Sequence, residues 1–270
     1  MKLGDVTRRP GFPLRMSAVT DPLSATEKIA KGSRELNVTG QNSILHTVKN
    51  SRSSGLGLDS QTVRSRMVQK LAAQGVSDSR VLAALGQVER HRFVDSALVN
   101  QAYEDTSLPI GLGQTISKPN VVARMLELLV QGRDGKLGRV LEIGTGCGYQ
   151  AALLAQLASE VYSVERLRAL HERARVNLRA LRVANLHLIF GDGMLGYASG
   201  APYAAIIAAA GGEALPQAWL DQLAVGGRLV APLQGIKGAQ ALVVVEKTAD
   251  GFSQTILEAV HFVPLKSGTS

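Results

Sequence analysis

The 270-residue chain lacks several features that mark large classes of proteins. Its single cysteine excludes an internal disulfide, which is the usual situation in a reducing compartment. No apolar run reaches the roughly 20 residues that a membrane-spanning helix needs. The basic residues near the start are not followed by the apolar stretch of a secretory signal peptide. We therefore expect a cytoplasmic protein with no membrane-spanning segment.

Aromatic residues and acidic charge are also scarce. Aromatic residues make up 4% of the chain, and 30 Lys and Arg outnumber 22 Asp and Glu, which gives a formal net charge of +8. Basic charge supports non-specific association with nucleic acid, but few aromatic rings are available to stack on bases. We therefore expect no stable nucleic-acid partner. The five histidines show no spacing typical of metal ligands or of a catalytic triad, so we expect no metal site.

What the chain does contain is a long alternation of short apolar segments and amphipathic segments from residue 140 onward. This alternation predicts an α/β fold with a doubly wound, mostly parallel seven-stranded sheet and helices on both faces. The last two strands follow each other without a helix, so we expect an antiparallel pair at one edge. The expected strands are Val140–Ile143, Glu160–Val164, Leu186–Phe190, Ala204–Ala208, Gly227–Ala231, Ala241–Lys247 and Thr255–Phe262, and the expected helices are Tyr149–Ala158, Arg166–Leu181 and Leu215–Leu223.

The part of the chain before this alternation divides in two. Residues 1–58 contain prolines, scattered charges and a Ser/Gly-rich stretch, so we expect a disordered extension with at most a short helix at Ala25–Leu36. Residues 59–130 are expected to form an N-terminal helical subdomain with an active-site loop, and residues 131–270 the core that binds the cofactor. We expect 59–270 to be one globular unit. The expected helices of the subdomain are Ser60–Gln74, Asp78–Val88 and Val121–Leu129.

The most informative local pattern is an apolar strand that runs directly into a glycine-rich turn, VLEIGTGCGY at 140–149. Glycine lets the backbone approach a ligand closely and adopt positive φ. The spacing is not the G-x-G-x-x-G of dinucleotide-binding proteins, and no Gly-Lys-Ser/Thr follows as in a P-loop. Glu142 stands beside the turn, where an anion disfavours polyphosphate. The pattern favours S-adenosylmethionine, which carries a sulfonium and an ammonium group.

Two more acidic residues follow the next two strands. Glu165 comes about 20 residues after the turn, where a carboxylate can accept hydrogen bonds from ribose hydroxyls. Asp192 follows the third strand and can reach an adenine amino group, with Gly193 leaving room for the base. Alone, Gly191–Gly193 is also an ordinary turn sequence. Because parallel strands present their carboxyl ends at one edge, we expect the three acids at a single ligand site.

Upstream of the sheet, Leu108–Ser117 combines glycines, small hydroxyls and an amide just before a helix N-terminus. Such a segment can fold over a cofactor and offer backbone N–H groups to an anion, although a purely structural loop fits the local sequence equally well.

Taken with the turn and the three acids, this segment makes the chain resemble the bacterial protein-L-isoaspartate O-methyltransferases from about residue 60 to 266. The Gln-Thr-Ile-Ser block at 114–117 is far more specific to this family than the glycine-rich turn, which related methyltransferases share. The matching stretches are Arg92–Val94, Tyr103–Asp105, Leu108–Gly111, Gly113–Ser117, Val140–Gln150, Ser163–Arg166, Gly191–Gly193, Gly226–Val230 and Phe262–Leu265.

The resemblance implies a Rossmann-like class I methyltransferase that uses S-adenosyl-L-methionine. Its substrate would be the free α-carboxylate of L-isoaspartyl residues in damaged proteins and peptides, with D-aspartyl residues as a further candidate. The methyl ester would start repair through a succinimide. The implied partners are isoaspartyl-containing proteins, and we expect the enzyme to be a monomer.

The resemblance also implies roles for particular residues. Ser117 would be the active-site hydroxyl beside the transferred methyl group. The cofactor site would comprise Thr115, Ile116, Glu142, Gly144, Thr145, Gly146, Glu165, Asp192 and Gly193, with Glu142, Gly144 and Gly146 at the methionine end. The substrate groove would comprise Leu108, Pro109, Ile110, Gly111 and Gln114.

Some positions depart from the family pattern and keep other functions open. Lys118 stands where the family often has Gln, Cys147 where it more often has Ser, and Ala208–Gly212 lacks polar groups that usually follow the fourth strand. One alternative is a cofactor-dependent methyltransferase for a small molecule or nucleic acid. Enzymes that methylate base amino groups would show Asn/Asp-Pro-Pro-aromatic in this loop, and it is absent here. The other alternative is a catalytically degenerate module that only binds the cofactor.

Overall fold

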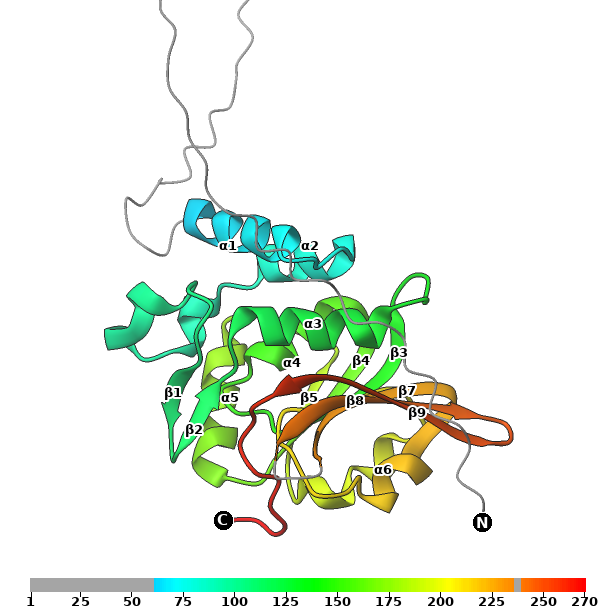
Figure 1. The fold of residues 1–270 in the computed structure, drawn as a ribbon. Helices are drawn as coiled ribbons and strands as arrows, with labels where there is room; N and C mark the ends of the chain where they lie inside the picture. The colour runs from blue at the N-terminus through cyan, green and yellow to red at the C-terminus, as the bar shows by residue number, and fades with distance from the viewer. Residues whose placement is uncertain (1–60, 236–238) are drawn as a thin grey trace, which may run out of the picture. The chain divides into compact units, whose positions relative to one another are not determined.

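A computed structural model describes residues 61–235 and 239–270, all of which belong to one compact unit, Gly55–Ser270. The expected disordered extension at 1–58 and its short helix at 25–36 lie outside the described residues. The unit is built around a seven-stranded sheet with the order β5-β4-β3-β6-β7-β8-β9 (Figure 1). Its strands are β3 (Leu137–Ile143), β4 (Ala158–Glu165), β5 (Leu186–Phe190), β6 (Tyr203–Ala208), β7 (Leu223–Gln234), β8 (Gln240–Thr248) and β9 (Gly251–Val260).

The topology of the sheet confirms the expected fold class. Strands β5, β4, β3, β6 and β7 run parallel, whereas β8 and β9 are antiparallel to their neighbours. The chain builds β3, β4 and β5 outward in one direction and then returns to place β6 on the other side of β3. This switch in strand order lies at β3, whose carboxyl end carries the glycine-rich turn. Open α/β sheets bind ligands at such a point.

The two faces of the sheet bury separate hydrophobic clusters. Along β3, Val140 points into the cluster that contains residues of α3 (Pro119–Val130), α4 (Tyr149–Leu157) and α5 (Arg168–Arg179). Leu141 and Ile143 point into the other cluster, which α6 (Gln217–Gln222) closes with Trp219. Alternate residues of a strand face opposite sides, so a sheet covered on both faces needs continuous apolar strands.

The N-terminal part is helical as expected and packs on the α3/α4 face of the sheet (Figure 1). Asp78 caps α2, because its side chain accepts hydrogen bonds from the backbone N–H groups of Arg80 and Val81. The elements are α1 (Gln61–Ala73), α2 (Ser79–Gln87), the 3₁₀ helices η1 (Arg90–Phe93) and η2 (Ser96–Gln101), and α3.

The structure corrects the expectation of a loop at Leu108–Ser117. Strands β1 (Leu108–Gly111) and β2 (Gln114–Ile116) pair antiparallel as a hairpin, with Leu108 opposite Ile116. The turn holds Gly111, Leu112 and Gly113 at positive φ. Strands this short, with a proline and flanking glycines, leave no readable alternation, so the expectation of a loop here was wrong.

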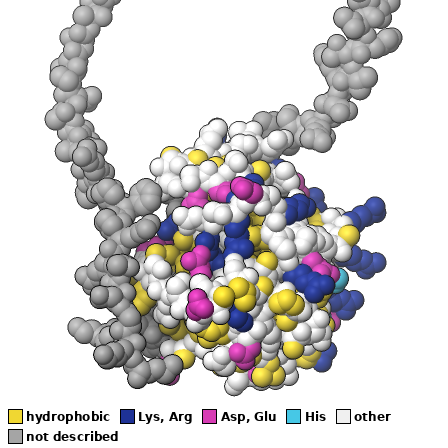
Figure 2. All heavy atoms as spheres, turned by 90° about the vertical axis from the view of Figure 1, so that its right-hand side faces the viewer, with side chains coloured by type: hydrophobic (Ala, Val, Ile, Leu, Met, Phe, Trp, Pro, Cys, Tyr) yellow, Lys and Arg dark blue, Asp and Glu magenta, His cyan; other side chains and the backbone are white. Residues whose placement is uncertain are grey.

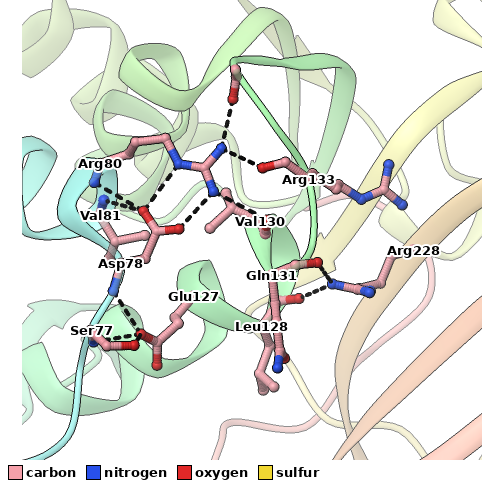
Figure 3. A network of polar contacts seen from close by, with 11 residues as sticks. Ser77, Asp78, Arg80, Val81, Glu127, Leu128, Val130, Gln131, Arg133 and Arg228 are labelled. Carbon is pink, nitrogen blue, oxygen red and sulfur yellow. Dashed lines mark hydrogen bonds and ion pairs between the residues drawn. The ribbon is translucent and has the colours of Figure 1, made fainter.

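A polar network around the C-terminal end of α3 joins the helical part to the sheet (Figure 3). Arg80 of α2 donates to the carbonyl oxygens of Val130 and Arg133 at 3.2 and 2.8 Å. Arg228 of β7 donates to those of Leu128 and Gln131 at 2.7 and 2.6 Å. The last carbonyls of a helix have no partner within the helix, so these two guanidinium groups satisfy them.

Figure 2 shows one face of the molecule, on which Lys and Arg side chains gather along one edge beside acidic ones. The hydrophobic side chains that are visible on this face lie in small separate groups. Scattered exposed apolar residues of this kind need no special explanation. Among the described helices, none is both long enough and apolar enough to cross a membrane.

Candidate active site

A cavity of about 740 Å³ opens at the carboxyl ends of β3, β4, β5 and β6. Its walls combine the glycine-rich turn, the end of β4, the β1–β2 hairpin and the segment that follows β9. This volume lies within the roughly 300–1,000 Å³ typical of small-molecule sites. The residues that line it include Ile110, Leu112, Gln114, Thr115, Ile143, Gly144, Gly146, Glu165, Gly193, Ala209, Leu265, Lys266 and Ser270.

A second cavity of about 490 Å³ adjoins the first, because Thr115, Ala209 and Val263 line both. A third space of about 40 Å³ also has Thr115 and Ala209 in its wall. Ser117 lines the second and third cavities. The half-buried Ser117 therefore lies where the second cavity meets the glycine-rich turn. We refer to the 740 Å³ space as the first cavity and to the 490 Å³ space as the second cavity.

Glu165 fixes the glycine-rich turn against the end of β4. Its Oε2 accepts a hydrogen bond from the N–H of Gly146 at 2.9 Å, and its Oε1 accepts one from Leu167 at 2.9 Å. The side chain is 5% exposed and lines the first cavity. Gly146 has φ of +57°, and a Cβ there would come 3.2 Å from Ile110 of the hairpin. The turn therefore needs glycine for its backbone and for its close approach to the hairpin.

Glu142 is fully buried and is not among the residues that line the three cavities. Its Oε2 accepts a hydrogen bond from Ser163 at 2.5 Å, and the Ser163 and Thr145 hydroxyl oxygens are 2.6 Å apart. Burial raises the pKa of Glu142 to about 8. The carboxyl group therefore supports the turn through Ser163 and Thr145.

Asp192 and Gly193 lie at the end of β5. The Asp192 side chain accepts a hydrogen bond from the N–H of Met194 through Oδ1 at 2.8 Å and from that of Gly268 through Oδ2 at 2.6 Å. The Gly193 carbonyl accepts a hydrogen bond from the indole of Trp219 at 2.7 Å. A Cβ on Gly193 would lie 2.6 Å from Cγ2 of Ile143, so this position has no room for a side chain.

Comparison with known proteins identifies the family. Over residues 62–270 the chain matches the family described as Protein-L-isoaspartate(D-aspartate) O-methyltransferase (PCMT). The chain belongs to this family. The family, fold class and enzyme class expected from the sequence are thereby confirmed.

Similar proteins cover most of the chain. A protein-L-isoaspartate O-methyltransferase of Methylibium petroleiphilum is 55% identical over 264 residues, which are 96% of this chain and 97% of that protein. One of Leptothrix cholodnii is 64% identical over 220 residues, covering 80% and 78% of the two chains. Among solved structures, a protein-L-isoaspartate O-methyltransferase matches with a TM-score of 0.69 at 28% identity, over 76% of this chain and 66% of that one.

The second structural match shows the fold alone. A Plasmodium falciparum structure in complex with S-adenosyl-L-homocysteine has a TM-score of 0.65 at 24% identity, covering 75% of this chain and 98% of that one. Both structural matches support the Rossmann-like methyltransferase architecture.

The structure brings most of the expected cofactor residues of this family member together. Gly144, Gly146, Glu165, Gly193 and Thr115 line the first cavity. Thr145 and Ile116 line the small third space instead, and Asp192 adjoins the first cavity through Gly193. A direct contact of Glu142 with cofactor stays a prediction.

The expected substrate residues are placed differently. Ile110 and Gln114 line the first cavity, whereas Leu108, Pro109 and Gly111 are not among the lining residues of the three cavities. The second cavity is walled instead by the start of α3 and the end of β9, through Ser107, Ser117, Lys118, Val121 and Ala259–Val263. The sequence indicated Ser117, Lys118 and the Phe262–Leu265 stretch of this wall, whereas Ser107, Val121 and Ala259–His261 carried no signal.

Buried Arg90 is a further residue whose place the sequence did not indicate. Its Nη2 donates a hydrogen bond to the carbonyl of Ser117 at 2.8 Å, and its Nε donates one to that of Ala102 at 2.8 Å. Its guanidinium lies 4.9 Å from the ring centre of Tyr149, at the start of α4. Burial lowers the pKa of Arg90. Arg90 thus links Ser117 to the helix that follows the glycine-rich turn.

Metal ligation has no candidate in the described part of the chain. Within 61–235 and 239–270, no three or more His, Cys, Asp or Glu side chains are arranged to hold a metal ion.

The buried carboxyl of Glu142 predicts a pH dependence of stability. Its pKa is raised from 4.5 to about 8, so the folded state keeps a proton that the unfolded state loses. The contribution of Glu142 to the free energy of unfolding is therefore fully present below about pH 4.5 and is lost as the pH rises through about 8. Between these values the free energy of unfolding falls by up to about 1.4 kcal/mol per pH unit. Chemical unfolding of Glu142→Gln between about pH 5 and 8 should show a smaller fall than the wild type.

The matched control is Glu172→Gln, since Glu172 is an exposed acid on α5. Its pH profile should run parallel to that of the wild type. A Glu142→Gln profile that also runs parallel to the wild type would show that Glu142 is not protonated in the folded protein.

Proposed function

We propose that this protein transfers a methyl group from S-adenosyl-L-methionine to the free α-carboxylate of L-isoaspartyl residues, and also to the side-chain carboxylate of D-aspartyl residues, in proteins and peptides. The observation that carries the proposal is the place of Ser117. Ser117 lines the second cavity, beside the glycine-rich turn that borders the first cavity. A site for methyl transfer needs a cofactor space and a substrate space that meet at one point.

The residues of the first cavity fit the cofactor. S-adenosylmethionine supplies an electrophilic methyl group on a sulfonium sulfur. Glu165 offers a buried carboxylate to the ribose hydroxyls at the end of β4, and we propose Asp192 and Gly193 for the adenine. Gly144 and Gly146 let the backbone approach the methionine end. A side chain on Gly193 would meet Ile143, so this position of the cavity wall requires glycine.

The chemistry requires no general base. A carboxylic acid has a pKa of roughly 4 and is ionised near neutrality, so the substrate oxygen is already a nucleophile. The task of the protein is then to align oxygen, methyl carbon and sulfur. We propose that the Ser117 hydroxyl donates a hydrogen bond to one carboxylate oxygen. A neutral donor orients this oxygen without the strong ground-state stabilisation that a cation would add.

The methyl ester then reacts further without help from the protein. The neighbouring backbone nitrogen attacks the ester carbonyl, methanol leaves, and a succinimide forms. Hydrolysis of the ring then yields some normal aspartyl linkage.

Mass spectrometry of an isoaspartyl peptide tests this route. After incubation with the protein and S-adenosylmethionine, the peptide should first gain one methyl group and then lose methanol. A methyl group that persists after mild base would indicate a different acceptor. An unmodified peptide, together with measurable cofactor binding, would favour the alternative of a module that only binds cofactor.

The second cavity predicts a preference among peptides. Lys118 and His261 line it, whereas none of its described lining residues is acidic. Lys118→Gln should raise the KM for peptides with an acidic residue beside the isoaspartyl by about threefold, since exposed ion pairs contribute up to about 1 kcal/mol. The KM for neutral peptides should stay unchanged. Steady-state assays at low and high salt measure this, because salt screens the attraction.

The control is Lys136→Gln, which removes the same charge from an exposed lysine just before β3, at the opposite end of that strand. Equal KM values for acidic and neutral peptides in the wild type would contradict the prediction.

We also propose that residues 59–270 form the active unit and that residues 1–58 are a dispensable extension. The family match begins at residue 62, and the residues lining all three cavities lie beyond it. A chain that starts at Asp59 should keep full methyl transfer and the same melting temperature. Loss of either would mean that the extension packs on the unit.

We further propose a monomer that acts in the cytoplasm. Support comes from the described residues of one chain, which build both cavities, and from the single buried cysteine. The molecular mass measured by sedimentation at micromolar concentration tests whether the protein is a monomer.

A further inference from the structure

The segment after β9 runs to the C-terminus (Figure 1, red). It lines the first cavity with Val263–Lys266 and Ser270. It is first held at the end of β6, where the N–H of Gly211 donates to the carbonyl of Val263 at 2.9 Å. The N–H of Leu265 then donates to the carbonyl of Gly211 at 2.8 Å. These two bonds place the segment beside the switch in strand order, next to Ala209 and Ala210 of the cavity wall.

The end of the segment is held on the other side of the cavity, at the ends of β4 and β5. The N–H of Ser270 donates to the carbonyl of Arg166 at 2.9 Å, and the N–H of Arg168 donates to the carbonyl of Ser270 at 2.8 Å. The Arg166 side chain donates through Nε to the carbonyl of Gly268 at 2.8 Å. The N–H of Gly268 donates to Oδ2 of Asp192 at 2.6 Å.

Residues 266–270, which we call the bridge, therefore run from Leu265 at the end of β6 to the ends of β4 and β5. Lys266 and Ser270 line the first cavity, together with Glu165 and Gly193. The β1–β2 hairpin contributes other wall residues, Ile110, Leu112, Gln114 and Thr115. The first cavity thus has the hairpin and the bridge as two separate parts of its wall, and the bridge is the part beside the residues proposed for ribose and adenine.

We propose that residues 266–270 complete the adenosine half of the cofactor site, with the Gly268 N–H as the positioning group for the Asp192 carboxylate. This inference rests on the proposed function, because it assumes that Asp192 binds the adenine base of the cofactor. Asp192 is a half-buried carboxylate held by two backbone donors, Met194 N–H on Oδ1 and Gly268 N–H on Oδ2. The two bonds together fix the plane of the carboxylate, whereas one bond leaves it free to rotate.

A fixed carboxylate can discriminate between bases. Each carboxylate oxygen can accept more than one hydrogen bond, so Asp192 keeps acceptor capacity for an exocyclic amino group. An oxo group at the same place on the base would bring a hydrogen-bond acceptor against the Asp192 carboxylate, which is also an acceptor. Sites that hold a polar group in a fixed geometry reject the unmatched analogue strongly, and this rejection weakens when the group can turn away.

The test compares two ligands, S-adenosylhomocysteine and its inosine counterpart, in which an oxo group replaces the 6-amino group. Gly268→Pro removes the N–H and is incompatible with the φ of +74° at this position. Calorimetry should show binding of the adenosyl ligand weakened by about tenfold, with binding of the inosyl ligand changed less than twofold. Gly268→Asn keeps the N–H and tolerates positive φ, so it should retain the wild-type preference.

Each outcome decides a different point. If Gly268→Pro weakens binding of both ligands equally, the bridge only forms part of the cavity wall. If it leaves binding of both ligands unchanged, the bridge plays no part in the site. Either result overturns the proposal. Loss of the preference in Gly268→Asn as well would show that the N–H is not responsible. Wild-type protein that binds neither ligand would contradict the proposed function itself. Melting temperatures of the variants within about 3 °C of the wild type verify that the fold is kept.

Discussion

Ser117→Ala is expected to lower kcat for an isoaspartyl peptide by about 100-fold while the dissociation constant of S-adenosylmethionine changes less than twofold. The magnitude follows from the loss of one positioned donor at a reacting oxygen, which costs about 10²–10³ in rate in comparable sites. The cofactor should be unaffected, because Ser117 lines the second and third cavities and is not among the residues that line the first. Steady-state kinetics and calorimetry on the same preparation measure the two effects.

Ser117→Thr is the matched control because it keeps a hydroxyl at the same position. It should retain more activity than Ser117→Ala. Two results would contradict the assigned role. One is a fall in cofactor affinity as large as the fall in kcat, and the other is a Ser117→Ala enzyme that keeps more than half of the wild-type rate.

The second large effect is expected at the end of β4. Glu165→Gln should weaken binding of S-adenosylmethionine by about 100-fold. The carboxylate accepts hydrogen bonds from the backbone N–H groups of Gly146 and Leu167, one on each oxygen. An amide in its place turns an N–H₂ group toward one of these donors and also loses charge at the proposed ribose contact. Charge-assisted hydrogen bonds contribute about 1.5–3 kcal/mol each, which is up to about 100-fold in affinity.

The control for this prediction is Glu172→Gln on α5, which removes the same charge from an exposed side chain. Its cofactor affinity should match that of the wild type. Unchanged affinity in Glu165→Gln, measured by calorimetry, would remove Glu165 from the cofactor site whatever happens to the rate.

Much of the sheet could be predicted from the sequence because its strands are buried on both faces. Leu186–Phe190 has the expected bounds, and the strands ending at Ile143 and Ala208 end where predicted. Two edge-side strands were less well predicted, since Gly227–Ala231 is part of the longer β7 and Thr255–Phe262 is shifted from β9 at Gly251–Val260. Helix starts differ from the expected ones by up to two residues. The helix after β4 begins at Arg168 and not at Arg166, because Glu165 accepts a hydrogen bond from Leu167 and keeps that residue out of the helix. Contacts of this kind form only once the tertiary structure exists.

The residues of the proposed site also differ in whether the sequence could predict them. Glu165 and Gly193 follow predicted strands, so the topology of a parallel sheet alone brings them together. The bond from Gly268 to Asp192 spans 76 positions, and the bond from Arg90 to Ser117 spans 27. No local periodicity encodes contacts of this separation. The sequence therefore indicated the motifs of the site but not the bridge over it or the buried arginine behind it.

The most direct measurement is methyl transfer from labelled S-adenosylmethionine to two peptides that differ only in an isoaspartyl or a normal aspartyl linkage. The proposed function predicts base-labile label on the isoaspartyl peptide and none on its aspartyl counterpart. Equal labelling of both peptides, or no labelling of either by protein that binds the cofactor, would contradict it.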